Sequence, residues 1–66
     1  LGFFSDNGGF YVAPGDWIRV RNRRYDVALI KEIINFKSGT LYLVMFPNKA
    51  EEFHTRASLA RLMVER

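Results

Sequence analysis

Residues 15–34 constrain the fold most, because they contain two strand-like segments on either side of a short basic break, RNRR. The first segment, residues 16–21, alternates between two kinds of side chain, with Ile18 and Val20 on one face and Trp17, Arg19 and Arg21 on the other. This alternation predicts a strand with one buried face. We expect the two segments to pair as antiparallel strands.

The second segment, residues 25–34, is apolar on both faces over Val27, Ala28, Leu29 and Ile30. A sheet with one solvated face could not bury such a strand, since neighbouring side chains point to opposite faces. The pattern therefore predicts a small, strongly bent sheet that curls around its own core.

The composition excludes several classes of protein. The 66 residues suffice for one domain, and a hydrophobic content of 48% excludes a disordered tail. With no cysteine and one histidine, we expect no disulfide, no metal site and no cofactor. No apolar run approaches the roughly 20 residues of a membrane span, and no signal-peptide pattern opens the chain.

The start of the chain predicts a module taken from a longer intracellular protein, because the first residue is Leu1 rather than methionine. Residues 1–9 contain the turn-forming SDNGG and have no regular period, so we expect a leader or linker there. Residues 10–66 form the predicted domain.

The remainder of the domain carries further strand and turn signals. Strands are expected at residues 10–13, 40–46 and 51–55, the last with Phe53 pointing inward. Turns are expected at Pro14-Gly15, at 35–39 and at Pro47-Asn48.

The C-terminus allows two interpretations. Either residues 56–60 form one helical turn and 62–64 a fifth short strand, or residues 55–66 form a single helix capped by Thr55. The first interpretation is favoured. It gives an all-β fold, a small SH3-like barrel of five strands whose closure removes exposed sheet edges.

Few residues suit catalysis. His54 lies near Glu51 and Glu52, yet the sequence has no glycine elbow, phosphate loop or recognisable carboxylate pair. Ser58 and the other serines lie in turn or cap positions, where hydroxyl groups bond to the backbone. We therefore expect no enzymatic activity and a surface or partly buried His54.

Four aromatic residues lie at or near predicted strand ends: Trp17, Tyr25, Phe46 and Phe53. At the open end of a barrel, aromatic faces can receive a cation such as a methylated ammonium group. Alternatively they fill the core, which applies best to Phe46 and Phe53, whereas a rim position is favoured for Tyr25. Trp17 shares a face with arginines and is expected to contact a partner or to cover the N-terminal segment.

The formal net charge is +3, and four of the ten basic residues lie within six positions: Arg19, Arg21, Arg23 and Arg24. These arginines either solvate an outward face and a loop, or hold phosphates of DNA or RNA while aromatic rings stack on bases. An acidic peptide would fit the same patch.

The side chains of residues 40–46 alternate between the two faces of a strand. One face has Tyr42, Val44 and Phe46, and the other has Leu41, Leu43 and Met45. If the first set faces the core, the second forms an outward apolar patch that needs a cover. A second subunit, the N-terminal segment or another domain would provide it. Alternatively, the curvature of the barrel buries the patch.

These segments resemble the Tudor and chromo-barrel group of the Royal superfamily over about residues 12–63. The resemblance rests on five motifs: GDWIRVRN, RYDVALIKEI, GTLYLVMF, EEF and a closing SLARL. It implies a Tudor-like barrel in a nuclear, chromatin-associated protein. It also implies a reader of methylated lysine or arginine in histone or other protein tails.

The aromatic cage of that family is matched in part. Tyr25 matches the aromatic that opens the second strand, and Phe46 the aromatic that closes the third. Arg21 or Asn22 stands where an aromatic would end the first strand, and residues 48–50 lack the expected acidic and aromatic residues. A bound cation would meet the charge of Arg21, which costs Coulomb energy.

The sequence thus supports three hypotheses. The leading one is a non-catalytic Tudor-like module that binds a histone or other protein tail, methylated or not. The first alternative is a DNA- or RNA-binding domain that uses the basic first hairpin. The second is an assembly or dimerisation element that uses Leu41, Leu43 and Met45.

Overall fold

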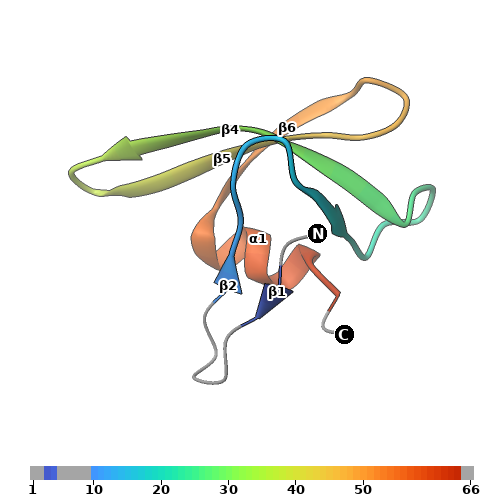
Figure 1. Ribbon diagram of the computed structural model, residues 1–66, viewed down its shortest axis with the longest axis horizontal. Helices are drawn as coiled ribbons and strands as arrows, with labels where there is room; N and C mark the ends of the chain where they lie inside the picture. Colours follow the sequence, from blue (N-terminus) through green and yellow to red (C-terminus); the bar gives the residue numbers. More distant parts are fainter. Residues whose placement is uncertain (1–2, 5–9, 65–66) are drawn as a thin grey trace.

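The computed structural model of the protein describes residues 3–4 and 10–64. In chain order these form β1 (Phe3–Phe4), β2 (Phe10–Tyr11), β3 (Trp17–Arg19), β4 (Val27–Phe36), β5 (Gly39–Met45), β6 (Glu51–Thr55) and α1 (Arg56–Leu62). Strands β1 and β2 pair with each other, and β3 to β6 form one antiparallel sheet in sequential order (Figure 1).

The predicted pairing of the first two main strands is confirmed, with Ile18 of β3 opposite Ala28 of β4. Their connection is longer than expected, and β4 begins two residues later than predicted. Asn22, its best turn former, organises this connection, because its Oδ1 accepts hydrogen bonds from the amides of Arg24 (2.8 Å) and Tyr25 (3.3 Å).

The predicted turn at Pro14-Gly15 is also present. Gly15 has φ +94°, and the amide of Asp16 donates to the carbonyl of Ala13 at 3.0 Å. Proline followed by a glycine of positive φ is the pattern of a type II turn. This turn leads the chain from β2 into β3.

One extra residue interrupts the pairing of β4 with β5. Ile30 lies opposite Val44 and Glu32 opposite Leu43, so Lys31 between them has no partner. A bulge of this kind reverses the alternation of side chains along a strand. Beyond it, Glu32 points away from the core and Ile33 packs against it.

The core lies between the sheet and α1, which covers one sheet face (Figure 1). Its largest fully buried side chains are Ile18, Ile30, Val44 and Leu59. Phe10, Val20 and Met63 complete it, each at most 4% exposed. The predicted inward face of residues 40–46 is confirmed, since Tyr42, Val44 and Phe46 are all buried.

The C-terminus combines both predicted interpretations. Thr55 caps α1, because its hydroxyl oxygen accepts a hydrogen bond from the amide of Ser58 at 3.1 Å. The helix ends at Leu62, and Met63 then forms an antiparallel bridge with Val20 of the first hairpin. The amide of Arg21 donates to the carbonyl of Leu62 at 2.7 Å.

The predicted closed barrel is wrong. In the part of the chain that the structure describes, β6 pairs with β5 alone, and the bridge of Met63 extends the sheet at β3 without joining β6. The helix explains this, because α1 fills the core side with Leu59 where a barrel would close on itself. The described part of the fold is therefore mostly β, with an open four-stranded sheet, the small β1–β2 pair and one short helix.

The expectation that both faces of residues 27–30 would be buried is wrong for the same reason. Ala28 and Ile30 are fully buried, whereas Val27 and Leu29 on the opposite face are only half-buried. An open sheet covered by one helix has one face left without a layer over it.

Arg56 attaches β2 to the sheet. Its Nη1 donates to the hydroxyl of Tyr42 and its Nη2 to the carbonyl of Phe10, each at 2.8 Å. Its guanidinium also lies 4.2 Å above the centre of the Phe10 ring. In the segment predicted as a leader, residues 1–2 and 5–9 lie outside the described residues, and Phe3–Phe4 form β1.

The first prediction concerns the cap of α1. Thr55→Ala removes the hydroxyl that satisfies the Ser58 amide, and we expect it to lower the free energy of unfolding by about 1 kcal/mol. Thr55→Ser keeps the hydroxyl and should lose much less. Urea denaturation of both variants measures the difference, and equal stabilities would contradict the role of the cap.

Candidate functional site

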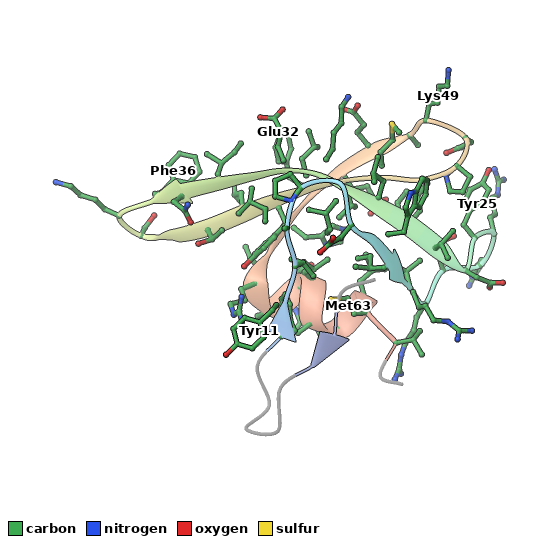
Figure 2. All side chains as sticks on the ribbon, viewed as in Figure 1. Tyr11, Tyr25, Glu32, Phe36, Lys49 and Met63 are labelled. Carbon is green, nitrogen blue, oxygen red and sulfur yellow. The ribbon has the colours of Figure 1, made fainter. Side chains whose placement is uncertain are left out.

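The sheet face opposite α1, which we call the outer face, has no covering layer among the residues that the structure describes (Figure 1). The strand register assigns its side chains as Trp17 and Arg19 of β3, Val27, Leu29, Glu32, Ile34 and Phe36 of β4, Leu41, Leu43 and Met45 of β5, and Glu51, Phe53 and Thr55 of β6. Figure 2 shows two of them, Glu32 and Phe36, on the side of the sheet away from Met63.

Three large aromatic side chains of the outer face are strongly exposed. The exposed fractions are 44% for Trp17, 54% for Phe36 and 60% for Phe53. The expected inward position of Phe53 is therefore wrong, and the cause is its register, which places it beside Leu43 on the outer face. Scattered apolar residues are ordinary on a surface, but several on one continuous face indicate a contact site.

The aliphatic residues between these aromatics are partly covered by one another. Leu41 and Met45 are half-buried and Leu43 is only 7% exposed, although all three point to the outer face as one interpretation predicted. Leu43 is covered because it lies in the middle of the sheet, flanked by Glu32 and Phe53 on the neighbouring strands. The apolar side chains of β5 thus form a row along the outer face, in which Leu43 is largely covered by its neighbours.

A shallow hollow of about 360 Å³ adjoins the outer face at the β4–β5 turn, lined by Phe36, Ser38, Gly39, Thr40, Leu41 and Thr55. It stays open because Gly39 opposite Phe36 has no side chain and β6 ends at Thr55. The hollow is lined by the apolar side chains of Phe36 and Leu41 and by three hydroxyl groups, a mixture that suits one amphipathic side chain of a ligand.

A charged cluster lies on the outer face beside the bulge. Lys31 of β4 forms an ion pair with Glu51 of β6, so the pair reaches across β5. The hydrogen bond and charge of Glu51, together with the more distant charge of Glu32, raise the pKa of Lys31 above its usual value. Two carboxylates surround one ammonium group, so the cluster has a surplus of one negative charge.

The four predicted cage residues do not converge. Tyr25 and Phe46 stack, with ring centres 6.1 Å apart and planes inclined by 27°. Phe46 is buried, however, and only Tyr25 is partly exposed. Trp17 and Phe53 lie on the outer face, three strand spacings or about 14 Å apart across the sheet and two residues apart along the strands. The stacked pair belongs to the core side, so the sheet separates the two sets.

The predicted arginine cluster is exposed throughout but divided in space. Arg19 points to the outer face from β3, whereas Arg21, Arg23 and Arg24 follow in the connection to β4. Neither of the two ion pairs within the described residues involves any of these four arginines. The connection beside Tyr25, at the end of the sheet remote from Phe36, is thus positively charged (Figure 2).

Sequence reasoning missed a hydrogen-bonded chain from β6 to α1. His54 Nε2 lies 2.9 Å from Glu52 Oε1, and its Nδ1 lies 2.7 Å from Ser58 Oγ. The spacing alone offered a signal, because Glu52 and His54 share a strand face and Ser58 lies in the first turn of the helix capped by Thr55. Through His54 and the Ser58 hydroxyl, these hydrogen bonds connect β6 to α1.

Residues 3–4 and 10–64 contain neither a metal-ligand cluster nor a membrane-spanning helix. Within these residues, no group of three or more potential ligands is placed to hold a metal ion. The helix of the described region is too short and too polar to cross a membrane.

Comparison with known proteins gives no relative: no family model, curated protein or solved structure matches the chain. The site must therefore be interpreted from its own geometry.

The second prediction concerns the charged cluster. In Glu51→Gln, Lys31 loses its strongest partner, so its pKa, followed by NMR of the Nζ group, should fall toward that of an ordinary lysine. Because the folded-state pKa is raised, the pair stabilises the fold below the usual lysine pKa of about 10.4 and loses this effect at higher pH. An unchanged pKa in Glu51→Gln would show that Glu51 does not cause the shift.

Proposed function

We propose that this chain is a non-catalytic protein-binding module, with an open Tudor-like arrangement of strands, that binds a protein partner on its outer face. The observation that carries the proposal is the exposure of Trp17, Phe36 and Phe53 around the aliphatic centre of one sheet face. Aromatic residues are enriched at the contact centres of protein interfaces.

The apolar area of this face provides a favourable contribution to binding. Aromatic side chains bury about 150–250 Å² each, so three that are about half exposed offer roughly 300 Å². At about 25 cal/mol per Å², their burial contributes roughly 7 kcal/mol before the costs of association. The half-buried Leu29, Ile34, Leu41 and Met45 add to this area.

The charges of the outer face favour a protein over a nucleic acid. Glu32 and Glu51 lie among the apolar residues, where they would repel a phosphate backbone. The unpaired arginines in the β3–β4 connection lie beyond the end of the sheet and do not border Phe53. A nucleic acid that used both features would have to pass the carboxylates.

The third prediction tests this proposal with a peptide library displayed on phage, selected against the domain. We expect apolar peptides that bind the wild type and not Phe53→Glu, because the new carboxylate would be buried in the contact. Ala57→Glu, an exposed change on α1, is the matched control and should bind normally.

Binding can be followed through Trp17, the only tryptophan of the chain, whose emission should shift to shorter wavelength as a peptide covers it. Peptides that bind wild type and Phe53→Glu equally well, with no change in Trp17 emission, would overturn the outer face as the binding site.

The stacked pair of Tyr25 and Phe46 favours a second candidate function, the binding of a methylated lysine of a protein tail. One partly exposed ring can attract a cation, which is worth about 0.5–1 kcal/mol at an exposed site. The site is open on the other sides, because Trp17 and Phe53, the other two predicted cage residues, lie on the outer face.

The fourth prediction follows from this single ring. A trimethyl-lysine histone-tail peptide should bind about two- to fivefold more tightly than the unmodified peptide, as expected for one cation–π contact. Tyr25→Leu should remove this preference, whereas Trp17→Leu on the outer face should keep it. Isothermal titration of both peptides decides the question, and equal affinities for the wild type would exclude the second candidate.

A further inference from the structure

The β3–β4 connection and the β5–β6 turn lie at one end of the sheet, which we call the basic end. Trp17 of β3 and Glu51 of β6 are level with each other across the sheet. Two residues farther toward this end, Arg19 and Lys49 follow on the same two segments. Figure 2 shows Lys49 and Tyr25 at this end of the molecule. The fold therefore adds Lys49 to the arginine cluster, although the two are distant in the chain.

The basic end has a large surplus of positive charge. Residues 19–27 and 46–50 contain one carboxylate, Asp26, and five cations: Arg19, Arg21, Arg23, Arg24 and Lys49. This surplus of four exceeds the net charge of +3 for the whole chain. All five cations are exposed, and none belongs to an ion pair within the described residues. Such a local field attracts an anionic ligand.

An aromatic ring lies among these charges. Tyr25 is partly exposed, and its ring stacks on that of Phe46 with 6.1 Å between the ring centres. Phe46 also begins the β5–β6 turn, because its carbonyl accepts a hydrogen bond from the amide of Lys49 at 2.8 Å. The stacked pair thus joins the two segments of the basic end and leaves part of the Tyr25 ring open.

The β3–β4 connection is ordered by its own hydrogen bonds. The amide of Val20 donates to the carbonyl of Asp26 at 2.8 Å, and Asn22 Oδ1 accepts from the amides of Arg24 and Tyr25. None of these bonds involves a guanidinium group. The loop therefore keeps its arginine side chains for a ligand, and less conformational entropy is lost when an ordered loop binds.

We propose that the basic end binds single-stranded nucleic acid, with Tyr25 stacking on one base and the surrounding cations contacting phosphates. Aromatic rings beside basic side chains bind single strands in this way. Arg19 and Lys49 are three strand spacings or about 14 Å apart, which matches about four stacked nucleotides at roughly 3.4 Å each. A duplex keeps its bases paired, so it offers Tyr25 no base to stack on.

This site goes beyond the proposed protein-binding face. It does not use Phe36 or Phe53, so the failure of either proposal leaves the other standing. Tyr25 is also the ring of the second candidate function, and a methylated tail would compete with the oligonucleotide for it.

Fluorescence anisotropy of labelled oligo(U) and oligo(dT) measures the binding, with strands of about ten nucleotides as suits a small single-strand-binding domain. With about four phosphates contacted, the affinity should fall about fiftyfold between about 50 and 200 mM salt. Tighter binding of either oligonucleotide supports the site and identifies RNA or DNA as the better ligand. A duplex of the same length should bind more weakly than the single strands.

Lys49→Asn and Lys37→Asn are a matched pair, since each removes one positive charge from an exposed turn. Asparagine tolerates the φ of +72° at position 49, and Lys37 lies in the β4–β5 turn at the other end of the sheet. Lys49→Asn should weaken binding about fivefold at about 50 mM salt and reduce the salt slope by about 0.7. Lys37→Asn should change neither. Arg23→Gln combined with Arg24→Gln should reduce the slope by about twice as much as Lys49→Asn.

Tyr25 variants test the stacking separately from the charge. Tyr25→Leu should weaken binding about tenfold and leave the salt slope unchanged, because a stacked base releases no counterion. Tyr25→Phe keeps the ring and should bind as the wild type does. Tyr25 packs against the core, so circular dichroism checks that both variants are folded. The lysine and arginine variants leave the core untouched and test the site independently.

Three results would overturn the nucleic-acid site. The first is no binding of either oligonucleotide at about 50 mM salt, where phosphate contacts are strong. The second is an equal loss of affinity in Lys49→Asn and Lys37→Asn, which would show an effect of net charge alone. The third is a duplex or a polyglutamate peptide that binds as tightly as the single strands.

Discussion

The bulge at Lys31 is the constraint on which the rest of the structure depends. Strict alternation along β4 from Ala28 and Ile30 would place Glu32 in the core, where an unpaired carboxylate is very costly. The extra residue moves Glu32 to the outer face and brings Ile33 against the core. Alternation from Leu29 already places Lys31 on the outer face, where it pairs with Glu51 across β5, and the bulge adds the carboxylate of Glu32 to that face.

The core residues could be predicted from the sequence wherever inward and outward side chains alternate without interruption along a strand. The inward set of β5 and the burial of Ile18 and Val20 follow from a period of two, and the turn at Pro14-Gly15 follows from backbone preferences. The bulge could not be predicted from the sequence, because it is defined by which residues of β5 lie opposite those of β4. The predicted inward position of Phe53 is wrong for the same kind of reason, because the face on which Phe53 lies is set by its pairing with Leu43 of β5.

The open sheet was missed because the apolar pattern of residues 27–30 has two physical solutions. Curvature can bury both faces of such a strand, or a helix can cover one face and leave the other without a layer over it. The second holds here, since Leu59 and Met63 fill the inner side and Leu29 stays half-buried outside.

The dispersal of the aromatic residues limits the kinds of ligand that the domain can bind. A cage concentrates rings around one cation, but here the sheet lies between the stacked pair and the exposed rings of Trp17 and Phe53. Rings spread over a flat face, with aliphatic residues and a few charges between them, match a surface rather than a single group. Because that face has both signs of charge, a partner bound as we propose would be oriented by charge, while the apolar area would supply the affinity.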